Sequence, residues 1–460
     1  MKMNPLTSPL LTDLYQLTML QGYVDNGMHD TSAFEFYVRT MPENRGFLVA
    51  AGLDTLLAFL EGMQFSEEEL KYLDGAGRFS AKLLDYLAAF RFRGDVFAMP
   101  EGTVFFENEP VIRIEAPLPV AQLVETRLIN ILQFEILIAS KASRCILAAA
   151  DRAILVDFGV RRAHGAEAGI LAARASYIAG FAGTSTVIAE TLMGIPIFGT
   201  MAHSYIEAHE NELDAFLSFA RANPSNTTFL IDTYDVHRGA ETTVEAAKLL
   251  APEGIKVNAV RLDSGDILAL SNGVRRILDQ SGFKDISIFA SGNLDEYSIR
   301  DLLAKGAPIT GFGIGTKLDT SEDTPYLECA YKLMEYAGIP RFKKSPGKVT
   351  IPGRKQVFRQ FENGKMSGDI LTLADEKEAG GTPLLRKVME HGRRISGSPD
   401  LKEIAAYTRT QLNSLPEYLR SLGKTPPYPV STSSVLAKLA KDIEATLGSK
   451  AVRQPGNIPA

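Results

Sequence analysis

Short apolar runs recur through the middle of the chain, and each run ends in a small cluster of polar residues. Between residues 154 and 320 the pattern occurs about seven times, with a helix-like stretch after each cluster. The runs are Ile154–Phe158, Ile178–Ala182, Ile195–Phe198, Thr228–Ile231, Val257–Leu262, Ile286–Phe289 and Ile309–Phe312. Runs of this length are typical of strands buried on both faces of a sheet. Strands that alternate with helices predict a parallel sheet of the α/β class. Because the usual barrel has about eight strands, we expect an irregular or incomplete (β/α) barrel.

The first 120 residues follow a different pattern, which predicts an α+β N-terminal domain over residues 1–120. The expected elements are a helix over Asp13–Asn26 capped by Thr12, a strand through Phe34 and Val38, helices over Leu53–Glu61 and Ser66–Leu73, and short β segments over Phe92–Ala116. Ser66 and Glu69 have the spacing of a capping box. An amphipathic helix over Val120–Ala150 then leads into the strand–helix series, so we expect the barrel to cover residues 121–335.

The alternation stops after about residue 335, where a basic, turn-rich segment begins. This segment runs from Lys343 to Arg359, and two helical patterns follow over Leu401–Leu422 and Ser431–Leu447. We therefore expect residues 336–460 to form a C-terminal segment made of a basic loop plus helices that pack on the N-terminal domain. The basic loop either closes over phosphate groups or is a solvated loop.

Composition limits the kind of protein. Its 460 residues are 45% hydrophobic and 23% charged, and no stretch approaches the roughly 18 apolar residues of a membrane span. The absence of a signal-peptide pattern, and the lone thiols of Cys145 and Cys329, predict a cytoplasmic protein with no membrane partner. The net charge of −6 argues against nucleic acid as a partner. An anionic ligand would therefore need a local basic cluster.

Arginines mark two of the expected strand ends, where parallel sheets bind their ligands. Arg161 and Arg162 directly follow the first run, and Arg261 lies within an otherwise apolar run. A guanidinium there can bind phosphate or carboxylate in a bidentate manner. Arg161 and Arg162 could instead lie on a solvated helix face. An unpaired charge at Arg261 would be costly, so its partner is either Asp263 or an anionic ligand.

Histidine and aspartate follow the neighbouring runs. His203 lies beside Ser204 in the segment Gly199–Ser204, where it could be a general base, a metal ligand, a nucleophile toward phosphate or a hydrogen-bonded structural residue. Two pairs of aspartates, Asp232 with Asp235 and Asp263 with Asp266, could bind Mg²⁺ or ribose hydroxyls. Asp235 and Asp266 could equally cap the helices that follow them.

Glycines follow the last two runs, in Ala290–Asn293 and Gly311–Thr316. Glycine lets the backbone approach a phosphate, and the next helix supplies amide donors. Two such cradles after the last strands are usual in phosphate-binding barrels. A Rossmann fold is disfavoured because no acidic partner follows about 20 residues later in a separate βαβ unit.

Together these motifs resemble the nicotinate phosphoribosyltransferase family. They are Thr12–Gln16, Phe158–Ala163, Gly199–Ser204, Asp232–Asp235, Val260–Asp266, Ala290–Asn293 and Gly313–Thr316, with further similarity in Tyr331–Leu333 and Pro352–Gln356. The resemblance runs in order from about residue 8 to residue 360. It implies an irregular (β/α) barrel flanked by an α+β domain, in a homodimer whose active sites are shared between subunits.

The resemblance also implies a reaction, the first step of NAD salvage from nicotinate. Nicotinate and phosphoribosyl pyrophosphate would give nicotinate mononucleotide and pyrophosphate, with ATP as co-substrate, Mg²⁺ as cofactor and His203 as a phosphohistidine. Arg261 would hold the nicotinate carboxylate, Tyr15 of the neighbouring subunit would reach the pyridine ring, and Arg161 would lie near the phosphates. Asp232 and Asp263 would lie near ribose, the metal or Arg261. Further implied binding residues are Thr200, Ser204 and Arg162, and at the 5′-phosphate Ser291, Gly292, Gly313, Gly315 and Thr316.

Three alternatives stay open at the level of sequence. One is a sibling transferase that uses nicotinamide or quinolinate, although quinolinate enzymes are shorter and lack the histidine. Another is a catalytically silent relative that binds nucleotides. The third is an unrelated phosphate-binding barrel, such as a sugar-phosphate aldolase or isomerase, for which Lys317 is the candidate Schiff-base lysine on the rim.

Overall fold

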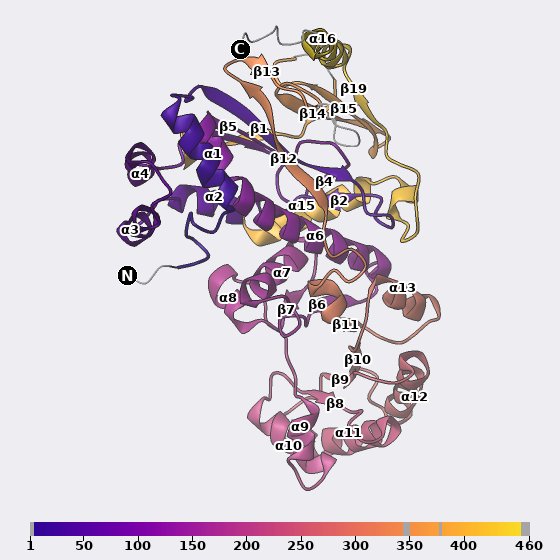
Figure 1. The fold of residues 1–460 in the computed structure, drawn as a ribbon. Coiled ribbons are helices and arrows are strands. Elements are labelled where there is room, and N and C mark those ends of the chain that lie inside the picture. Colours follow the sequence, from indigo (N-terminus) through magenta and orange to yellow (C-terminus); the bar gives the residue numbers. More distant parts are fainter. Residues whose placement is uncertain (1–3, 344–349, 377–379, 452–460) are drawn as a thin grey trace, which may run out of the picture. The chain divides into compact units, whose positions relative to one another are not determined.

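The chain folds into two compact units (Figure 1). The computed structural model describes residues 4–343, 350–376 and 380–451. The first unit comprises Met1–Ile136, Tyr326–Asp400 and Thr410–Ala460, and the second comprises Leu137–Pro325 and Leu401–Arg409. In the described ranges, no helix is both long and apolar enough to cross a membrane.

The first unit is an α+β structure. Its helices are α1 (Leu14–Asp25), α2 (Leu53–Gly62), α3 (Glu67–Gly75), α4 (Ala81–Ala88), α5 (Leu118–Leu123), the first part of α6 (Glu125–Ala149), the last part of α15 (Leu401–Ser414) and α16 (Ser434–Ala451). Its strands are β1 (Thr31–Thr40), β2 (Leu48–Val49), β3 (Asp95–Ala98), β4 (Val104–Phe105), β5 (Ile112–Pro117), β12 (Glu328–Tyr336), β13 (Ile339–Pro340), β14 (Lys355–Glu362), β15 (Lys365–Leu373), β16 (Thr382–Pro383), β17 (Arg386–Glu390), β18 (Arg393–Arg394) and β19 (Val430–Thr432).

Strands from distant parts of the sequence share the sheets of this unit. The largest sheet has the order β13-β12-β1-β5-β3-β17-β18, and a second has the order β16-β14-β15-β19. β1 lies between β5 and β12, with both pairings antiparallel. Its Phe36 and Val38 are fully buried, which fits the apolar pattern that predicted a strand here.

Local signals in the N-terminal sequence were mostly correct. The capping box of Ser66 and Glu69 is present at the start of α3. The predicted cap of α1 is wrong, because Asp13 and not Thr12 occupies the N-cap position. Asp13 instead accepts a hydrogen bond of 2.8 Å from the Thr126 hydroxyl. At the other end of the chain, Ser431 lies in strand β19, so the last helix begins at Ser434.

The basic segment before residue 360 is not simply a loop. Lys355 and Arg359 belong to β14 and are 3% and 0% exposed. Lys355 Nζ lies 2.8 Å from Glu35 Oε2, and an Arg359 terminal nitrogen lies 2.6 Å from Asp369 Oδ2. A buried charge requires such a partner. Both of the open interpretations of this segment, a phosphate-closing loop and a solvated loop, are therefore wrong for these two side chains, while residues 344–349 of the segment lie outside the described residues.

The second unit contains the strand–helix series. Its strands are β6 (Ile154–Asp157), β7 (Gly183–Thr184), β8 (Thr228–Leu230), β9 (Ala259–Leu262), β10 (Ser287–Ala290) and β11 (Gly311–Ile314). Its helices include α7 (Ala166–Ile178), α8 (Val187–Met193), α9 (His203–Glu207), α10 (Glu212–Ala222), α11 (Val236–Leu250), α12 (Ile267–Gln280), α13 (Glu296–Ala304) and α14 (Thr316–Asp319). Figure 1 shows α9–α13 arranged around the strands β8–β11.

These strands form one parallel sheet of order β7-β6-β11-β10-β9-β8 in the described residues. A single parallel bridge from Thr184 to Ile197 extends its β7 edge, and no β7–β8 ladder closes the sheet within the described part of the chain. The prediction of an irregular or incomplete (β/α) barrel is confirmed. All of these strands end on the same edge because they are parallel.

Three of the predicted strands differ in detail. Ile178 ends α7, so the strand there is the shorter Gly183–Thr184, and the run Ile195–Phe198 contributes only the single bridge. The last strand was predicted over Ile309–Phe312, but β11 covers Gly311–Ile314, two residues later in the sequence. A Cβ at Gly313 would lie 2.4 Å from the Phe158 ring. Gly313 was predicted to follow the strand but lies within it, and glycine at this position leaves room for the aromatic ring.

Candidate active site

Arg261 is the central cation at the carboxyl edge of the sheet. It lies in β9, and its side chain is only 13% exposed. One terminal nitrogen donates to Thr200 Oγ1 at 2.8 Å and to the Met201 carbonyl at 3.2 Å, and the other lies 3.4 Å from Asp263 Oδ1. Its Nε is buried and has no hydrogen-bond partner among the described residues. Both partners considered for Arg261 therefore stay relevant: Asp263 is one, and Nε is left for another acceptor.

Burial of Arg261 has an electrostatic cost. It lowers the pKa of the guanidinium, whereas the nearby carboxylates Asp263 and Asp232 raise it and Arg161 lowers it. Arg161 is therefore close enough to act on Arg261, although it lies on the loop after β6. Arg161 and Arg162 are both exposed, as expected for cations that await an anionic partner or solvent.

Two aspartates at neighbouring strand ends share one hydrogen-bond network. Asp232 follows β8, and its Oδ2 accepts from the Asp263 amide at 3.0 Å and the Ser264 hydroxyl at 2.6 Å. The Ser291 hydroxyl, after β10, donates to Asp263 Oδ1 at 2.5 Å. Asp232 Oδ1 is buried without a hydrogen-bond partner in the described ranges. The ends of β8, β9 and β10 thus present a linked pair of carboxylates.

The other two aspartates have local structural roles. Asp235 accepts from the Arg238 amide and Asp266 from the Ala269 amide, so each caps the helix that follows it. The N-cap interpretation of these residues is confirmed, and they take no part in the carboxylate network described above.

His203 begins α9 and is oriented by one hydroxyl. Its Nδ1 lies 3.1 Å from Thr233 Oγ1, in the segment that follows β8. The neighbouring Ser204 side chain is exposed, and Thr200 is the residue that binds Arg261. The loop from Thr200 to Ser204 therefore reaches both the arginine and the end of β8.

The glycines pack closely against this site. Gly292 has a φ of +92°, and a Cβ there would lie 1.9 Å from the Asp263 carbonyl oxygen. Gly315 lies next to the Phe158 carbonyl, 3.0 Å from where its Cβ would be, and Thr316 then starts α14 and is exposed. Glycine at positions 292 and 315 therefore allows the backbone of β10 and β11 to turn directly beside the neighbouring strands.

Tyr15 lies in the first unit. It belongs to α1 and is 48% exposed. Burial of part of its ring and the nearby Glu125 carboxylate raise the pKa of its hydroxyl, whereas the side chains of Gln16 and Thr126 lower it.

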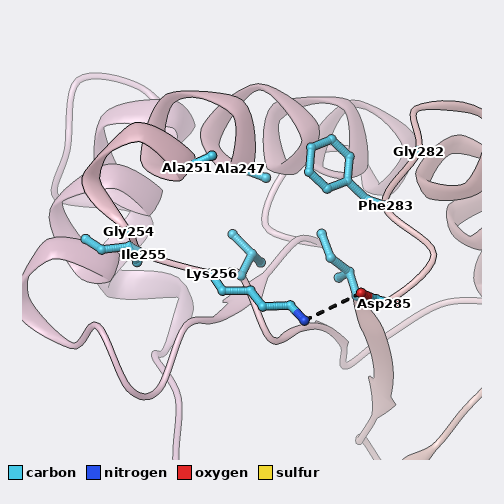
Figure 2. Close-up of a pocket in the computed structure, with 10 residues that line it drawn as sticks. Ala247, Ala251, Gly254, Ile255, Lys256, Gly282, Phe283 and Asp285 are labelled. Carbon is cyan, nitrogen blue, oxygen red and sulfur yellow. Dashed lines mark ion pairs between the residues drawn. The ribbon is translucent and has the colours of Figure 1, made fainter.

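The cavity in Figure 2 lies at the opposite end of the strands. It has a volume of about 320 Å³, and its lining includes Lys256 and Asp285, which precede β9 and β10. Lys256 Nζ lies 3.5 Å from Asp285 Oδ2, and both side chains are highly exposed. A surface ion pair of this kind contributes little to stability. The cavity is separate from the arginine and carboxylate cluster because its lining precedes β9 and β10, whereas the cluster lies at the carboxyl ends of the strands.

Family models match the chain over three segments. The N-terminal domain of nicotinate phosphoribosyltransferase matches residues 10–133, the nicotinate phosphoribosyltransferase family matches residues 154–338, and the C-terminal domain matches residues 377–440. The chain belongs to the nicotinate phosphoribosyltransferase family. The members of this family discussed below share nearly the whole length of the chain.

Two curated family members illustrate the similarity. The nicotinate phosphoribosyltransferase pncB2 of Mycobacterium tuberculosis is 48% identical over 435 residues, which cover 94% of this chain and 93% of that protein. The nicotinate phosphoribosyltransferase of Bacillus subtilis is 36% identical over 456 residues, 92% of each chain.

Solved structures agree with the family at the level of the fold. The crystal structure of human nicotinic acid phosphoribosyltransferase has a TM-score of 0.85 at 28% identity, covering 94% of this chain and 99% of that chain. That of nicotinate-nucleotide pyrophosphorylase from Pyrococcus furiosus has a TM-score of 0.73 at 26% identity, covering 90% and 98%. The fold shared with these enzymes therefore extends over nearly the full length of the chain.

Residues to which the sequence motifs assigned no role also shape this candidate site. Thr233 orients His203, and Phe158 fills the space that Gly313 leaves. Asp157 and Asp319 are buried beside Gly159. A carboxylate within an otherwise apolar run, as Asp157 is in Ile154–Phe158, is the signal that could have marked one of them. Lys317, the lysine considered for an aldolase, is ion-paired with Asp295 at 2.7 Å.

The carboxylate pair is compatible with Mg²⁺. The described residues contain no group of three or more His, Cys, Asp or Glu side chains that could hold a metal by themselves. Mg²⁺ is commonly bound by one or two carboxylates together with water and substrate phosphates. The partnerless Oδ1 of Asp232, beside Asp263, fits that kind of site.

Proposed function

We propose that this protein transfers the phosphoribosyl group of phosphoribosyl pyrophosphate to nicotinate, giving nicotinate mononucleotide and pyrophosphate, and couples the transfer to ATP hydrolysis. This reaction would be the first step of NAD salvage from nicotinate. The observation that carries the proposal is the buried Arg261, held by Thr200 and Asp263 at the sheet edge with its Nε unpartnered among the described residues. A buried, oriented guanidinium is suited to bind a carboxylate.

Recognition of nicotinate would depend on Arg261. Thr200 and the Met201 carbonyl fix one terminal nitrogen, so the guanidinium plane is oriented before substrate arrives. Preorganisation of this kind reduces the entropy lost on binding. Nicotinamide has no carboxylate, so it would lose the charge-assisted interaction with Arg261 that nicotinate gains.

Bond breaking at the sugar would depend on charge stabilisation. The carbon–oxygen bond to pyrophosphate breaks as the pyridine nitrogen forms its bond to the same carbon, and the transition state has oxocarbenium character. Asp232 and Asp263, which share one hydrogen-bond network, would place negative charge near this developing cation, while the exposed Arg161 and Arg162 would stabilise the departing pyrophosphate. Asp232 and Asp263 would also hold Mg²⁺, which when bound neutralises phosphate charge.

His203 would carry the coupling to ATP. Thr233 contacts Nδ1, so Nε2 is the nitrogen left to attack the γ-phosphorus of ATP. An N–P bond forms, the bond to the bridging oxygen breaks and ADP leaves. Water later hydrolyses the phosphohistidine and releases phosphate. The added negative charge beside Arg161 and Arg261 would reorganise the site between steps.

A homodimer with shared active sites is part of the proposal. Tyr15 is exposed on α1, together with its neighbour Leu14, which is 53% exposed. Tyr15 of the partner subunit would then reach the pyridine ring. This arrangement predicts that Tyr15→Ala weakens nicotinate binding without changing its own subunit's fold.

The deciding experiment is an assay with purified protein. It is incubated with phosphoribosyl pyrophosphate, Mg²⁺ and either nicotinate, nicotinamide or quinolinate, with and without ATP, and mononucleotide and ADP are measured. We expect product from nicotinate, with ADP formed in parallel and the rate raised by ATP. Product from nicotinamide or quinolinate alone would assign a sibling reaction, and binding without any product would assign a silent relative.

A further inference from the structure

Two buried carboxyl groups lie directly behind the candidate site. Asp157 is the last residue of β6 and Asp319 is the last residue of α14, and they are 0% and 1% exposed. Both side chains lie against Gly159: its amide donates to Asp157 Oδ1 at 2.7 Å, and a Cβ at Gly159 would lie 2.1 Å from the Asp319 carboxyl carbon. Two carboxylates that close cannot both remain ionised without water or cations, so the pair must share a proton.

The surrounding donors decide which carboxyl holds the proton. Asp157 Oδ1 accepts from the Gly159 amide at 2.7 Å, and its Oδ2 accepts from the Thr184 hydroxyl at 2.6 Å. Both oxygens of Asp319 are buried and have no hydrogen-bond donor among the described residues, so an ionised Asp319 would lie beside Asp157 without any donor to stabilise it. Burial and the charge of Asp157 hold the pKa of Asp319 well above its usual range. Asp319 is therefore the protonated partner and donates to Asp157.

This pair joins the two loops that carry the anion-binding candidates. β6 and β11 are adjacent, and Asp157 lies opposite Ile314. Asp157 holds the amide of Gly159, which precedes Arg161 by two residues. A Cβ at Gly159 would lie 2.1 Å from the Asp319 carboxyl carbon, so this glycine packs directly on Asp319. The helix that Asp319 ends begins at Thr316.

We propose that protonated Asp319 is a positioning residue for phosphoribosyl pyrophosphate. By donating to Asp157 it holds the loop of Arg161 and Arg162 against the turn of Gly315 and Thr316, so that both reach the same phosphorylated substrate. This inference rests on the proposed function for its substrate, and Asp319 itself contacts no substrate. Loss of the proton would place two negative charges side by side and separate the two loops.

Among the residues that the structure describes, few charged groups surround Asp319. Asp157 acts on it from β6. The ionisable residues of α7, which packs against α14, include Glu167 and Arg174, and within α14 Lys317 is paired with Asp295. Substitution of Asp319 by Asn tests the proton directly, because an amide still donates to Asp157 but cannot titrate.

The first measurement concerns the proton alone and needs no activity. Infrared difference spectra between the wild-type protein and Asp319→Asn at neutral pH should contain the C=O band of a buried carboxylic acid in the wild type. The exposed Asp279→Asn substitution on α12 is the matched control and should leave that band in place. Absence of the band in wild type would overturn the proposal, whatever reaction the protein catalyses.

The second measurement is binding of phosphoribosyl pyrophosphate by calorimetry across pH. Asp319→Ala should weaken binding roughly tenfold at neutral pH, the range expected when a buried hydrogen bond is lost, and Asp319→Asn should recover most of that loss. At alkaline pH wild type should lose affinity more steeply than Asp319→Asn. If Asp319→Ala and Asp319→Asn bind phosphoribosyl pyrophosphate equally well, or if the affinities of wild type and Asp319→Asn change with pH in parallel, Asp319 has only a structural role and the proposal is overturned.

Thermal stability separates this inference from the proposed function. The folded-state pKa of Asp319 is raised, so its stability contribution is present at low pH and is lost as pH rises toward that pKa. Asp319→Asn should therefore gain melting temperature relative to wild type as pH increases. The two measurements can disagree. If the melting temperatures follow this expectation but calorimetry detects no binding of phosphoribosyl pyrophosphate at any pH, the proposed function and the substrate role of Asp319 are overturned, while the assignment of the proton to Asp319 stands.

Discussion

At the level of single residues, the site is built from side chains that are nearly, but not completely, satisfied. Arg261 uses both terminal nitrogens within the protein and leaves its buried Nε unpartnered among the described residues. Asp232 likewise uses one oxygen and leaves the other buried and unpartnered in the same described ranges. A buried polar atom without a hydrogen-bond partner costs free energy. Arg261 Nε and Asp232 Oδ1 therefore favour binding of a ligand that forms hydrogen bonds with them.

Arg261→Ala tests carboxylate recognition. We expect the KM for nicotinate to rise roughly 10- to 100-fold, because a charge-assisted hydrogen bond contributes about 1.5–3 kcal/mol, while the KM for phosphoribosyl pyrophosphate changes less. Arg261→Lys should be intermediate, since it keeps the charge but not the planar fork. Steady-state kinetics provide the measurement, and the exposed Arg300→Ala on α13 is the control. An unchanged KM for nicotinate would move carboxylate recognition to another residue.

His203→Ala tests the coupling to ATP. We expect stimulation by ATP to be lost and a slow ATP-independent transfer to remain, because the phosphoryl acceptor is removed and the substrate-binding arginine is not. Incorporation of label from γ-labelled ATP into protein should disappear as well. His209→Ala is the matched control, since His209 is a histidine close in sequence whose Nδ1 lies 2.7 Å from the Tyr205 carbonyl oxygen. Full coupling in His203→Ala would remove this residue from the proposed role.

At the level of elements, the parallel strands determine which residues meet. Asp232, Arg261 and Ser291 are far apart in sequence, yet β8, β9 and β10 are neighbours and end on one edge. Glycine allows this close packing where aromatic rings or carbonyl groups approach. The site is therefore a property of strand order as much as of its side chains.

Gly313→Ala tests the packing of β11. The new Cβ would lie 2.4 Å from the Phe158 ring, so the ring or the strand must move. We expect a lower melting temperature and weaker substrate binding, because Phe158 begins the loop of Arg161. Gly199→Ala, where nothing lies within 4 Å of the new Cβ, is the control for stability. If Gly313→Ala melts and binds like wild type, the contact with Phe158 does not constrain the site.

Much of this arrangement could be predicted from sequence, and the exceptions have physical reasons. Apolar runs identified most of the strands, since buried parallel strands need little else. The predicted position of β11 was wrong by two residues. Gly311 and Gly313 face the rings of Phe289 in β10 and of Phe158 after β6, and a local pattern does not contain such distant contacts. Lys355 and Arg359 were read as part of a basic loop because their partners Glu35 and Asp369 are supplied by other strands. Asp319 escaped notice for the same reason.

At the level of the whole molecule, the first unit contains a buried network of charged side chains that the proposed reaction does not use. Arg359 bonds to Asp369, and its terminal nitrogen lies 3.9 Å from Glu109. Burial and the charge of Asp369 hold the pKa of Glu109 well above its usual range. Such a network is costly to break because the remaining carboxylate would be buried without its counter-ion.

Arg359→Met therefore tests a structural role against a phosphate-binding one. We expect the free energy of unfolding in urea to fall by about 3 kcal/mol, as when one partner of a buried pair is removed, with the KM values for ATP and phosphoribosyl pyrophosphate unchanged in folded protein. Arg386→Met, at an exposed position of β17, is the control. A raised KM with unchanged stability would instead assign Arg359 to phosphate binding.

The position of β1 has a consequence for synthesis on the ribosome. Ser32 of β1 pairs with Tyr336 of β12, about 300 residues later in the chain. At translation rates of roughly 5–20 residues per second, β1 would have one open hydrogen-bonding edge for roughly 15 to 60 seconds. An apolar strand with such an edge can pair with other nascent chains. Expression conditions that slow translation should therefore reduce the yield of soluble protein unless a chaperone protects β1. Every newly made chain would pass through this period with an unpaired β1 edge.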